Sequence, residues 1–371
     1  MALAGTLDPE KTAAAVVNYL RQAMDTADEV QVGNVTSSTT SGFSQEVVRC
    51  EASWRIEGEL HQRRLVVRVA PTGPGLFPDY DLAQEHRIMQ ALAEHSQVPV
   101  PQVLFYEPDA TLLGGPFLIM EHVEGRTAAD DPPFTVEGWV VELSPEQQGF
   151  LYDNSLQILA SVQAVDWRAA GLEDLRRPDA GDTPLERHLA YLERFARFAY
   201  EGEPTELVTA ALRWLQSNRP LEPEPTVLSW GDARLANMLV ADDLTINAAI
   251  DWEEATLASP ELDLGYFLYV IRNYTVGIGV PRPPGFPTPQ QTLQRYEELT
   301  GHKPVNIPYY ERAAAVTAAL VVARVASLMI EAGFIPPESS LATNNPATQL
   351  LAQMYGLPAP DGAVAAWHGQ R

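Results

Sequence analysis

Apolar and polar residues alternate with two different periods along this chain. Residues 64–70 alternate as a strand does, and residues 30–69 as a whole predict strands joined by a hairpin. Residues 81–92 instead carry their large apolar residues at the spacing of one helix face. The first third of the chain therefore predicts a small sheet followed by an amphipathic helix.

Helical patterns open the chain and dominate its second half. Asp8 followed by Pro9 is a typical helix start, with the aspartate as N-cap and the proline at the first helical position. The later apolar stripes predict helices at residues 151–165, 185–199 and 313–330. We expect the last of these to be a buried C-terminal helix.

Two stretches interrupt this helical half. Residues 127–142 are acidic and contain prolines, so we expect a surface excursion there. Residues 276–289 are rich in proline and glycine and cannot continue a helix. A loop of that length is either a lid or binding segment, or a plain tether.

The most informative stretch, residues 230–239, reads WGDARLANML. Asp232 precedes Asn237 by five residues, and Asp251 follows fourteen residues later at the end of an apolar run. An aspartate can accept a proton from an attacking hydroxyl, and Mg²⁺ prefers hard oxygen ligands such as a carboxylate and an amide oxygen. The pattern favours a phosphotransferase site with Asp232 as base and with Asn237 and Asp251 as Mg²⁺ ligands. The alternative is a turn followed by a helix cap.

Upstream residues supply what a nucleotide needs. Residues 39–44 form a small-residue turn, the kind whose backbone N–H groups approach phosphates closely. Arg68 lies on the expected strand and Glu85 on the helix after it, so the two can pair and direct the cation toward the α- and β-phosphates. A hairpin closure and two solvated charges are the alternative interpretations.

These motifs together resemble the aminoglycoside phosphotransferase-like (phosphotransferase enzyme) family. That family is the small-molecule branch of the protein-kinase-like fold, and it includes acyl-CoA-dehydrogenase-associated kinase domains. The matching pieces follow the family's order along residues 40–265: Ser41, Gly42, Phe43 and Ser44 as phosphate loop, residues 66–68 as third strand, Glu85 on the next helix, residues 117–125 as hinge, Asp232 to Asn237, Asp251, and residues 261–264.

The resemblance implies an α+β, bilobal protein-kinase-like fold. It places an N-terminal antiparallel sheet lobe at residues 1–120, a hinge at 121–125 and a mainly helical catalytic and acceptor-binding lobe at 126–371. Backbone groups of Glu121 and Val123 would then bind the nucleotide base.

Two departures from the family pattern concern Trp230 and the nucleotide cation. Trp230 stands where the family usually has histidine, so a hydrogen bond from that histidine, such as one to Asp263, cannot form in the same way. The chain has only two lysines, Lys11 and Lys303, and neither is on the third strand. Arg68 must therefore supply the charge, as a bidentate fork rather than a point charge.

Arg234 is a further catalytic candidate. It lies two residues after Asp232, so its guanidinium could stabilise charge on the γ-phosphate in the transition state. Alternatively it braces the loop by pairing with a carboxylate such as Glu253. Both interpretations stay open from the sequence.

Composition changes this picture little. The net charge of −24 argues against a nucleic-acid partner, which would need a basic face; it indicates either solubility or attraction of a polycationic acceptor. The single cysteine, Cys50, excludes an intramolecular disulfide framework. Residues 313–330 contain Thr317, Arg324 and Ser327 and fall short of ~20 clean apolar residues, so no membrane span is expected. We also find no signal peptide at the N-terminus and expect a cytoplasmic protein.

The sequence therefore predicts an enzyme that transfers the γ-phosphate of ATP or GTP, with Mg²⁺, to a hydroxyl of a small molecule. The acceptor is an aminoglycoside or another hydroxyl compound, such as a hydroxyacyl thioester or an amino alcohol. A catalytically silent nucleotide-binding or scaffold protein is the alternative from another class. The oligomeric state is left open.

Overall fold

The computed structural model describes residues 8–24, 26–37, 46–71, 73, 75–220 and 225–365. The chain forms two compact units, one of Met1–Gln90 with Pro101–Val123 and the other of Ala91–Val100 with Glu124–Arg371. The first unit holds an antiparallel sheet and the second is mainly helical, which confirms the expected α+β fold class.

Five strands form the sheet of the N-terminal unit, in the order β1-β2-β3-β5-β4. Neighbouring strands are antiparallel throughout, and β2 pairs with β3 without interruption from Glu46↔Val69 to Ile56↔Glu59. The strands are β1 Ala27–Ser37, β2 Glu46–Ile56, β3 Glu59–Val69, β4 Val103–Glu107 and β5 Phe117–Glu121, and the helices of this unit are α1 Pro9–Ala23 and the first part of α2 Leu82–His95.

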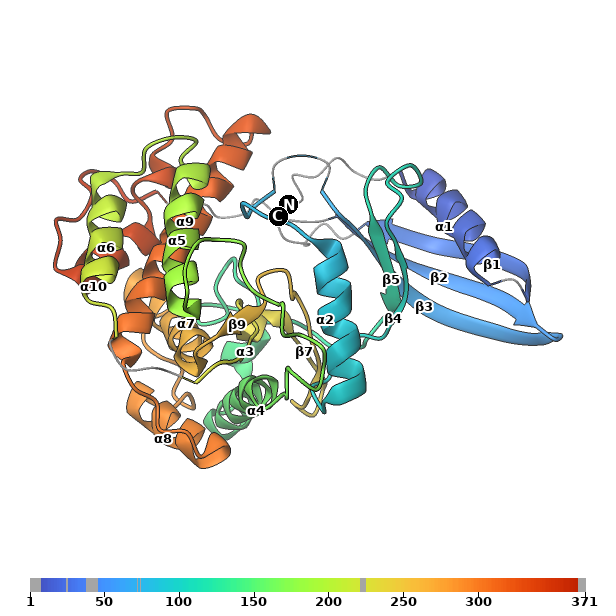
Figure 1. The fold of residues 1–371 in the computed structure, drawn as a ribbon, viewed down its shortest axis with the longest axis horizontal. Helices are drawn as coiled ribbons and strands as arrows, with labels where there is room; N and C mark the ends of the chain where they lie inside the picture. Colours follow the sequence, from blue (N-terminus) through green and yellow to red (C-terminus); the bar gives the residue numbers. More distant parts are fainter. Residues whose placement is uncertain are drawn as a thin grey trace. The chain divides into compact units, whose positions relative to one another are not determined.

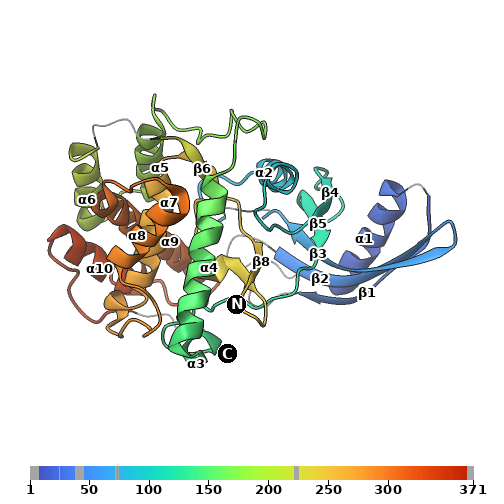
Figure 2. The same cartoon turned by 90° about the horizontal axis from the view of Figure 1, so that it is seen from below.

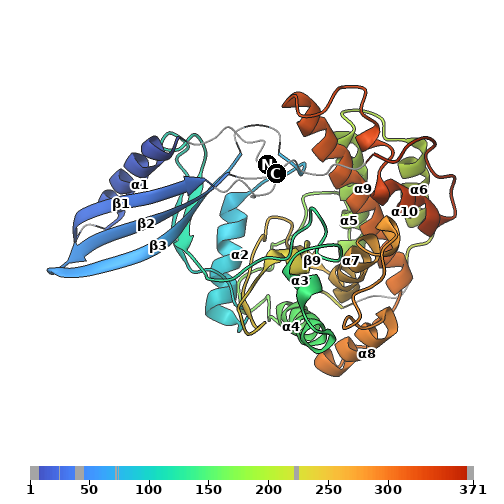
Figure 3. The same cartoon turned by 180° about the vertical axis from the view of Figure 1, so that it is seen from behind.

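Helix α1 covers one face of this sheet (Figures 1 and 2). It begins as the sequence predicts, because the Asp8 side chain accepts hydrogen bonds from the backbone N–H groups of Glu10 and Lys11. Its buried residues Val16 and Leu20 join one hydrophobic core with the inward-facing residues of β2, β3 and β5. The long β1, β2 and β3 are seen from the other side in Figure 3. The residues that alternate with this core in β3 lie on the opposite sheet face, and Arg68 is one of them.

The C-terminal unit consists of helices with two small two-stranded sheets, β6-β9 and β7-β8. The expected helices at 151–165 and 185–199 are confirmed as α4 and α5, each starting at a capping box one residue before a proline. The elements are α3 Trp139–Glu142, α4 Pro145–Gln163, α5 Pro184–Ala199, α6 Glu206–Ser217, β6 Val227–Ser229, η1 Leu235–Asn237, β7 Met238–Val240, β8 Ile246–Ala249, β9 Thr256–Ala258, α7 Pro260–Asn273, η2 Val276–Ile278, α8 Pro289–Thr300, α9 Ile307–Glu331, η3 Ser340–Ala342 and α10 Pro346–Tyr355.

Helix α9 is the buried helix expected near the C-terminus, but it is longer than its apolar run. Its 25 residues include an 18-residue window that is long and apolar enough to cross a membrane, yet 61% of that window is buried within the structure. It packs against α5, α6, α7 and α10 (Figure 1). Gly265 of α7 permits the closest approach, since a Cβ there would lie 2.6 Å from Cβ of Tyr310.

The prediction of a surface excursion at residues 127–142 is wrong at the centre of the segment, where Phe134 and Thr135 are buried. Phe134 is 1% exposed, and its ring packs edge-on against Tyr274 and beside Phe286. The acidic residues and prolines dominate the sequence pattern of this segment, so the pattern does not reveal its apolar contact with residues far along the chain. Such a partner leaves no local periodicity in the sequence.

The long loop expected at residues 276–289 is present, with the short turn η2 at its start. It is anchored on α4, because the N–H of Gly285 donates to Oε1 of Gln148 at 3.0 Å. A Cβ at Gly285 would lie 1.9 Å from the Pro145 carbonyl oxygen, so only glycine fits. At this point the loop is a fixed part of the unit and not a free lid.

Glu254, Arg177 and Tyr191 form a buried polar cluster next to β9 and α5. Glu254 Oε2 accepts hydrogen bonds from Arg177 at 2.9 Å and from the Tyr191 hydroxyl at 2.8 Å, while the Arg177 guanidinium lies 3.7 Å from the centroid of the Tyr191 ring. His188 of α5 is 7% exposed, and neither ring nitrogen has a hydrogen-bond partner among the described residues. Burial, helped by the charge of Arg177, lowers the pKa of His188 to about 3.

This histidine predicts an acid-sensitive stability that His188→Phe should remove. The unfolded chain binds a proton at this residue below pH 6.5, whereas the folded protein resists it until about pH 3, so folding loses stability as the pH falls through that window. The unfolding free energy of His188→Phe minus that of wild type should be larger by roughly 2 kcal/mol at about pH 5 than at about pH 7.5. Urea unfolding at both pH values measures this difference. Parallel changes in the two proteins would show that His188 is not the group concerned.

Candidate active site

The stretch 230–237 forms a tight loop between β6 and the β7-β8 hairpin. Gly231 makes the loop possible: its φ is +86°, and a Cβ there would lie 2.3 Å from the carbonyl oxygen of Glu254. The ladder of β7 and β8 pairs Met238 with Ala249, and the N–H of Ile250 donates to the carbonyl of Asn237 at 3.0 Å. The hairpin therefore places the residues on either side of it, Asn237 and Asp251, next to each other.

Asp263, in the first turn of α7, fixes the start of this loop. Its fully buried carboxylate accepts hydrogen bonds from the Ser229 hydroxyl at 2.8 Å, the Trp230 N–H at 2.7 Å and the Gly231 N–H at 2.9 Å. Burial raises the pKa of Asp263, and the three donors oppose that rise. Asp263 is thus bound by backbone groups, and no histidine is needed to reach it.

Trp230 is fully buried, and its indole N–H points to backbone carbonyl groups and not to Asp263. The N–H lies 3.1 Å from the carbonyl oxygens of both Ile250 and Asp251, and the ring stacks on Trp252 with 5.1 Å between centroids. The tryptophan that departs from the family pattern therefore connects the loop of Asp232 to the backbone of Asp251.

The carboxylate of Asp232 is surrounded by donors. Arg234 Nε lies 2.8 and 2.9 Å from its two oxygens, and Asn237 Nδ2 donates to Oδ2 at 2.7 Å. Arg234 also donates through Nη1 to Asp130, whose other oxygen accepts from the Tyr274 hydroxyl at 2.8 Å. The carboxylates that Arg234 binds are Asp232 and Asp130, not the Glu253 suggested by the sequence.

This cluster is electrostatically coupled. Burial on its own would lower the pKa of Arg234, but the charges of Asp130 and Asp232 outweigh it and raise that pKa well above the ordinary value. Burial, helped by Asp232, raises the pKa of Tyr266, and burial, helped by Asp130, raises the pKa of Tyr274. Arg234 is therefore always charged and both tyrosines stay neutral near pH 7.

The amide of Asn237 has a defined orientation. Its nitrogen donates to the carbonyl oxygen of Asp232 at 3.0 Å and to Oδ2 of the same residue. Oδ1 is then the atom left for a cation. Asp251 adopts a left-handed backbone conformation with φ of +68°, which is costly for a residue with a Cβ and is concentrated at functional sites.

These two residues fit Mg²⁺ better than a metal held by protein alone. No cluster of three or more His, Cys, Asp or Glu that could hold a metal occurs in the part of the chain that the structure describes. Mg²⁺ usually takes one or two carboxylates and completes its octahedron with water and substrate phosphates. One carboxylate and one amide oxygen at adjacent positions match that requirement.

Arg68 and Glu85 belong to the N-terminal unit, where they form a short ion pair. Arg68 Nη1 lies 2.6 Å from Glu85 Oε1, and the two side chains are 11% and 0% exposed. The strand and helix thus meet as the sequence suggests. The predicted phosphate loop Ser41, Gly42, Phe43 and Ser44 lies outside the described residues.

The expected hinge contains the change from one unit to the other, after Val123. The N–H of Glu121 donates to the Gln102 carbonyl, and that of His122 donates to Arg64 on the other side of the strand. Because successive residues of an extended chain alternate in direction, Val123 points its N–H to the same side as Glu121. Among the described residues Val123 has no hydrogen-bond partner.

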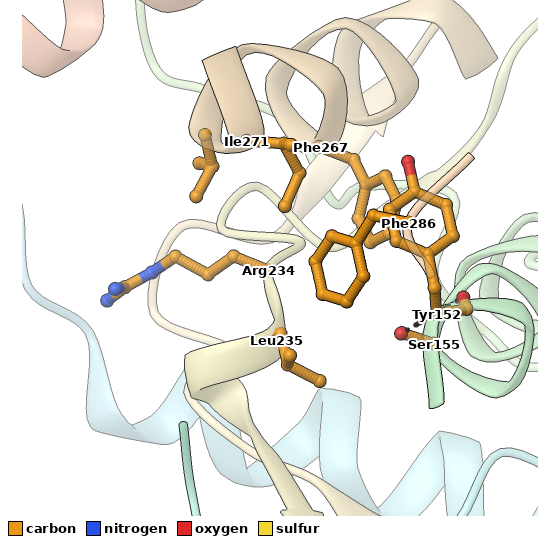
Figure 4. A pocket seen from close by; sticks show the side chains of 8 residues that line it. Tyr152, Ser155, Arg234, Leu235, Phe267, Ile271 and Phe286 are labelled. Atoms are coloured by element: carbon orange, nitrogen blue, oxygen red, sulfur yellow. Dashed lines mark hydrogen bonds between the residues drawn. The ribbon is translucent and has the colours of Figure 1, made fainter. Parts of the chain in front are cut away.

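A small cavity of about 10 Å³ lies beside the loop of Asp232, large enough for roughly one water. Its walls come from α4, α7, the 230–237 loop and the 276–289 loop, and Figure 4 shows aromatic rings gathered on one side with the stem of Arg234 on the other. Most of the lining is apolar: Tyr152, Ser155, Arg234, Leu235, Phe267, Val270, Ile271 and Phe286.

Sequence reasoning missed Asp130, Tyr266 and Tyr274. Asp130 lies 104 residues before its partner Arg234, inside a segment that looked like a surface loop. An aspartate in an acidic run gives no signal of its own. Tyr266, in the middle of α7, and Tyr274, at its C-terminal end, could have been suspected only once that helix was placed beside the loop of Asp232.

Comparison with known families settles the broad assignment. A sequence model described as the phosphotransferase enzyme family matches residues 40–297, which is more than half of the chain. The chain belongs to the phosphotransferase enzyme family. The description of the family is that of enzymes that transfer phosphate.

Among curated proteins, the phosphotransferase is 30% identical over 212 residues to the "Probable acyl-CoA dehydrogenase IBR3" of Arabidopsis thaliana. The match covers 55% of this chain and 24% of that protein, so the chain spans about a quarter of the relative's length.

Solved structures show the same fold. A proposed aminoglycoside phosphotransferase from Ralstonia eutropha superposes with a TM-score of 0.65 at 22% identity, covering 92% of this chain and 95% of the other. A macrolide 2'-phosphotransferase from Brachybacterium faecium gives a TM-score of 0.53 at 18% identity, with coverages of 88% and 99%.

The shared cation predicts strong coupling between Asp130 and Arg234. Arg234→Met leaves two carboxylates without their common partner, and Asp130→Asn leaves one carboxylate for the guanidinium. We expect each single change to destabilise the protein and the double variant to lose less than the sum, with a coupling free energy of about 1–3 kcal/mol. Chemical denaturation of the four proteins measures it. Additive losses would mean that the pair contributes nothing to folding.

Proposed function

We propose that this protein is a Mg²⁺-dependent small-molecule kinase that transfers the γ-phosphate of ATP or GTP to a hydroxyl group. The observation that carries the proposal is the double use of Asn237. Its amide nitrogen donates to Asp232, which leaves its oxygen for a cation, and the backbone of the same residue is bonded to Ile250, the residue before Asp251. One short hairpin thus joins a proton acceptor to a pair of hard oxygen ligands.

Asp232 is the proposed general base. As the acceptor oxygen forms its bond to the γ-phosphorus, its proton passes to the carboxylate of Asp232, and the bond from phosphorus to the nucleoside diphosphate oxygen breaks. Two side chains, Arg234 and Asn237, hold the carboxylate in one orientation. This pre-set position contributes more than basicity does, because phosphoryl transfer depends mainly on alignment.

Asn237 Oδ1 and the Asp251 carboxylate would hold Mg²⁺. The ion, when bound, neutralises charge on the β- and γ-phosphate oxygens. Asp251 keeps its carboxylate in place through a left-handed backbone that the surrounding loop must stabilise.

The N-terminal unit would bind the rest of the nucleotide. The guanidinium of Arg68, oriented by buried Glu85, suits the α- and β-phosphates, and residues 41–44 are proposed as the phosphate loop. The carbonyl of Glu121 and the N–H of Val123 are proposed to bind the base edge, which agrees with the unsatisfied peptide groups at Val123.

Arg234 is proposed to act through Asp232. Its charge is already balanced by Asp130 and Asp232, which weakens the case for direct neutralisation of the γ-phosphate. Its guanidinium instead keeps the carboxylate of Asp232 from rotating.

The acceptor is a small molecule, and two classes are supported by different observations. Aminoglycoside and macrolide phosphotransferases share the fold. The similarity to acyl-CoA dehydrogenase family proteins favours a less polar acceptor such as a hydroxyacyl thioester. A cytoplasmic location, without nucleic-acid or membrane partners, is part of the proposal.

A screen of hydroxyl compounds with Mg-ATP and Mg-GTP tests the proposal. A true acceptor should raise the melting temperature beyond the shift given by nucleotide alone, and should then be phosphorylated. Nucleotide binding with no turnover on any acceptor would favour the scaffold alternative.

Asp232→Asn is expected to lower kcat by about 10²- to 10⁴-fold, because it removes the proton acceptor. Nucleotide affinity should change less than about twofold, since Asp232 does not hold the metal. Asp130→Asn is the matched control: it removes a carboxylate from the same arginine and should cost far less activity. Turnover of Asp232→Asn at the wild-type rate would exclude this residue as base.

Asp251→Asn is expected to weaken Mg²⁺-dependent nucleotide binding by on the order of tenfold or more, because it removes the charged ligand. Asparagine keeps the size of the side chain and tolerates the left-handed backbone, so folding should be retained. Calorimetry of ATP binding with and without Mg²⁺ measures the effect. Unchanged Mg-ATP binding would make this carboxylate a structural one.

A further inference from the structure

The indole N–H of Trp230 is shared by two successive carbonyl groups. It lies 3.1 Å from the oxygen of Ile250 and 3.1 Å from the oxygen of Asp251. These two carbonyls belong to the peptide groups on either side of the Asp251 Cα. Their relative direction therefore depends on the backbone conformation of Asp251 alone.

One donor can reach both oxygens only in a helical conformation at Asp251. Successive carbonyls of an extended chain point in opposite directions, whereas those of a helical residue point the same way. Asp251 has a φ of +68°, in the left-handed region, and the shared donor then indicates the helical form of that region. This conformation is unfavourable for a residue with a Cβ, so it needs support from its surroundings.

The tryptophan ring is itself held firmly. The backbone N–H of Trp230 donates to Asp263 at 2.7 Å, and the ring lies on Trp252 at an interplanar angle of 21°. Both indoles are fully buried, so water cannot replace the donor. The position of the N–H is thus set by the same carboxylate that fixes the catalytic loop.

We propose that Trp230 is a positioning residue that holds Asp251 in its left-handed conformation and so presents the carboxylate to Mg²⁺. The proposal rests on the proposed function, because it takes Asp251 as a metal ligand. It gives the tryptophan at position 230, where the family usually has histidine, a role in metal binding. Loss of the N–H lets Asp251 relax toward the extended conformation and turns its carboxylate away from Asn237.

The test compares Trp230→Phe with Trp252→Phe. Trp252 is also a buried indole of the same stack, but its N–H donates to the Ala249 carbonyl at 3.1 Å, outside the peptide groups of Asp251. Each change removes one indole hydrogen bond and a similar volume. ATP binding is measured by calorimetry over a Mg²⁺ series, with the melting temperature of each protein as the measure of lost packing.

Trp230→Phe should raise the half-saturating Mg²⁺ concentration about tenfold, the usual minimum effect of losing support for a metal ligand, with ATP binding in the absence of Mg²⁺ unchanged. Trp252→Phe should lose similar thermal stability and keep its Mg²⁺ requirement within about twofold of wild type. Equal shifts in the two variants, or none in Trp230→Phe, would overturn the proposal.

Trp230→His provides a second measurement, and it decides the matter if the phenylalanine variant does not fold. Imidazole keeps a ring N–H, so its Mg²⁺ requirement should stay within about threefold of wild type even where the smaller ring lowers the melting temperature. A tenfold increase would overturn the proposal. Wild-type protein that binds ATP without any dependence on Mg²⁺ would instead refute the proposed function itself.

Discussion

The buried carboxylate of Asp263 is the contact on which the geometry of the site depends. A charge removed from water is costly unless donors surround it, and here three successive residues, Ser229 to Gly231, supply them. The same three bonds fix the backbone from which Asp232 projects. Since Asp263 is in the first turn of α7, the helix N-terminus adds favourable potential at the carboxylate. The hydrogen bonds that offset the cost of burying this charge therefore also fix the loop. Helix α7, which carries Asp263, packs closely against α9 at Gly265.

A second constraint is the sharing of one cation by two carboxylates. Arg234 lies between Asp232 and Asp130, and Tyr274 holds Asp130 from the opposite side. This arrangement connects the loop of Asp232 to a segment more than a hundred residues earlier and to the end of α7. It also leaves the region with less free negative charge than its residue types suggest. The −24 net charge of the chain is therefore a poor guide to the potential at this loop.

The sequence was sufficient where a function depends on local order. The spacing of Asp232, Asn237 and Asp251 identified one hairpin, and alternation at residues 64–70 placed Arg68 on a strand. It was insufficient where partners are distant, as for Asp130 and Arg234, or where an apolar contact is hidden in a polar segment, as at Phe134. The left-handed backbone at Asp251 was also invisible, because aspartate occurs in many conformations and only the surrounding hydrogen bonds select this one.

The distribution of charge bears on the acceptor. A polycationic acceptor needs carboxylates with free lone pairs near the base, yet both Asp130 and Asp232 are already engaged by a guanidinium that stays charged. Displacing Arg234 from them would cost the coupling that holds the loop. An acceptor that is bound without a carboxylate would leave that network intact. For this reason we propose an acceptor whose hydroxyl is attached to an apolar carbon framework over one that depends on multiple ammonium groups.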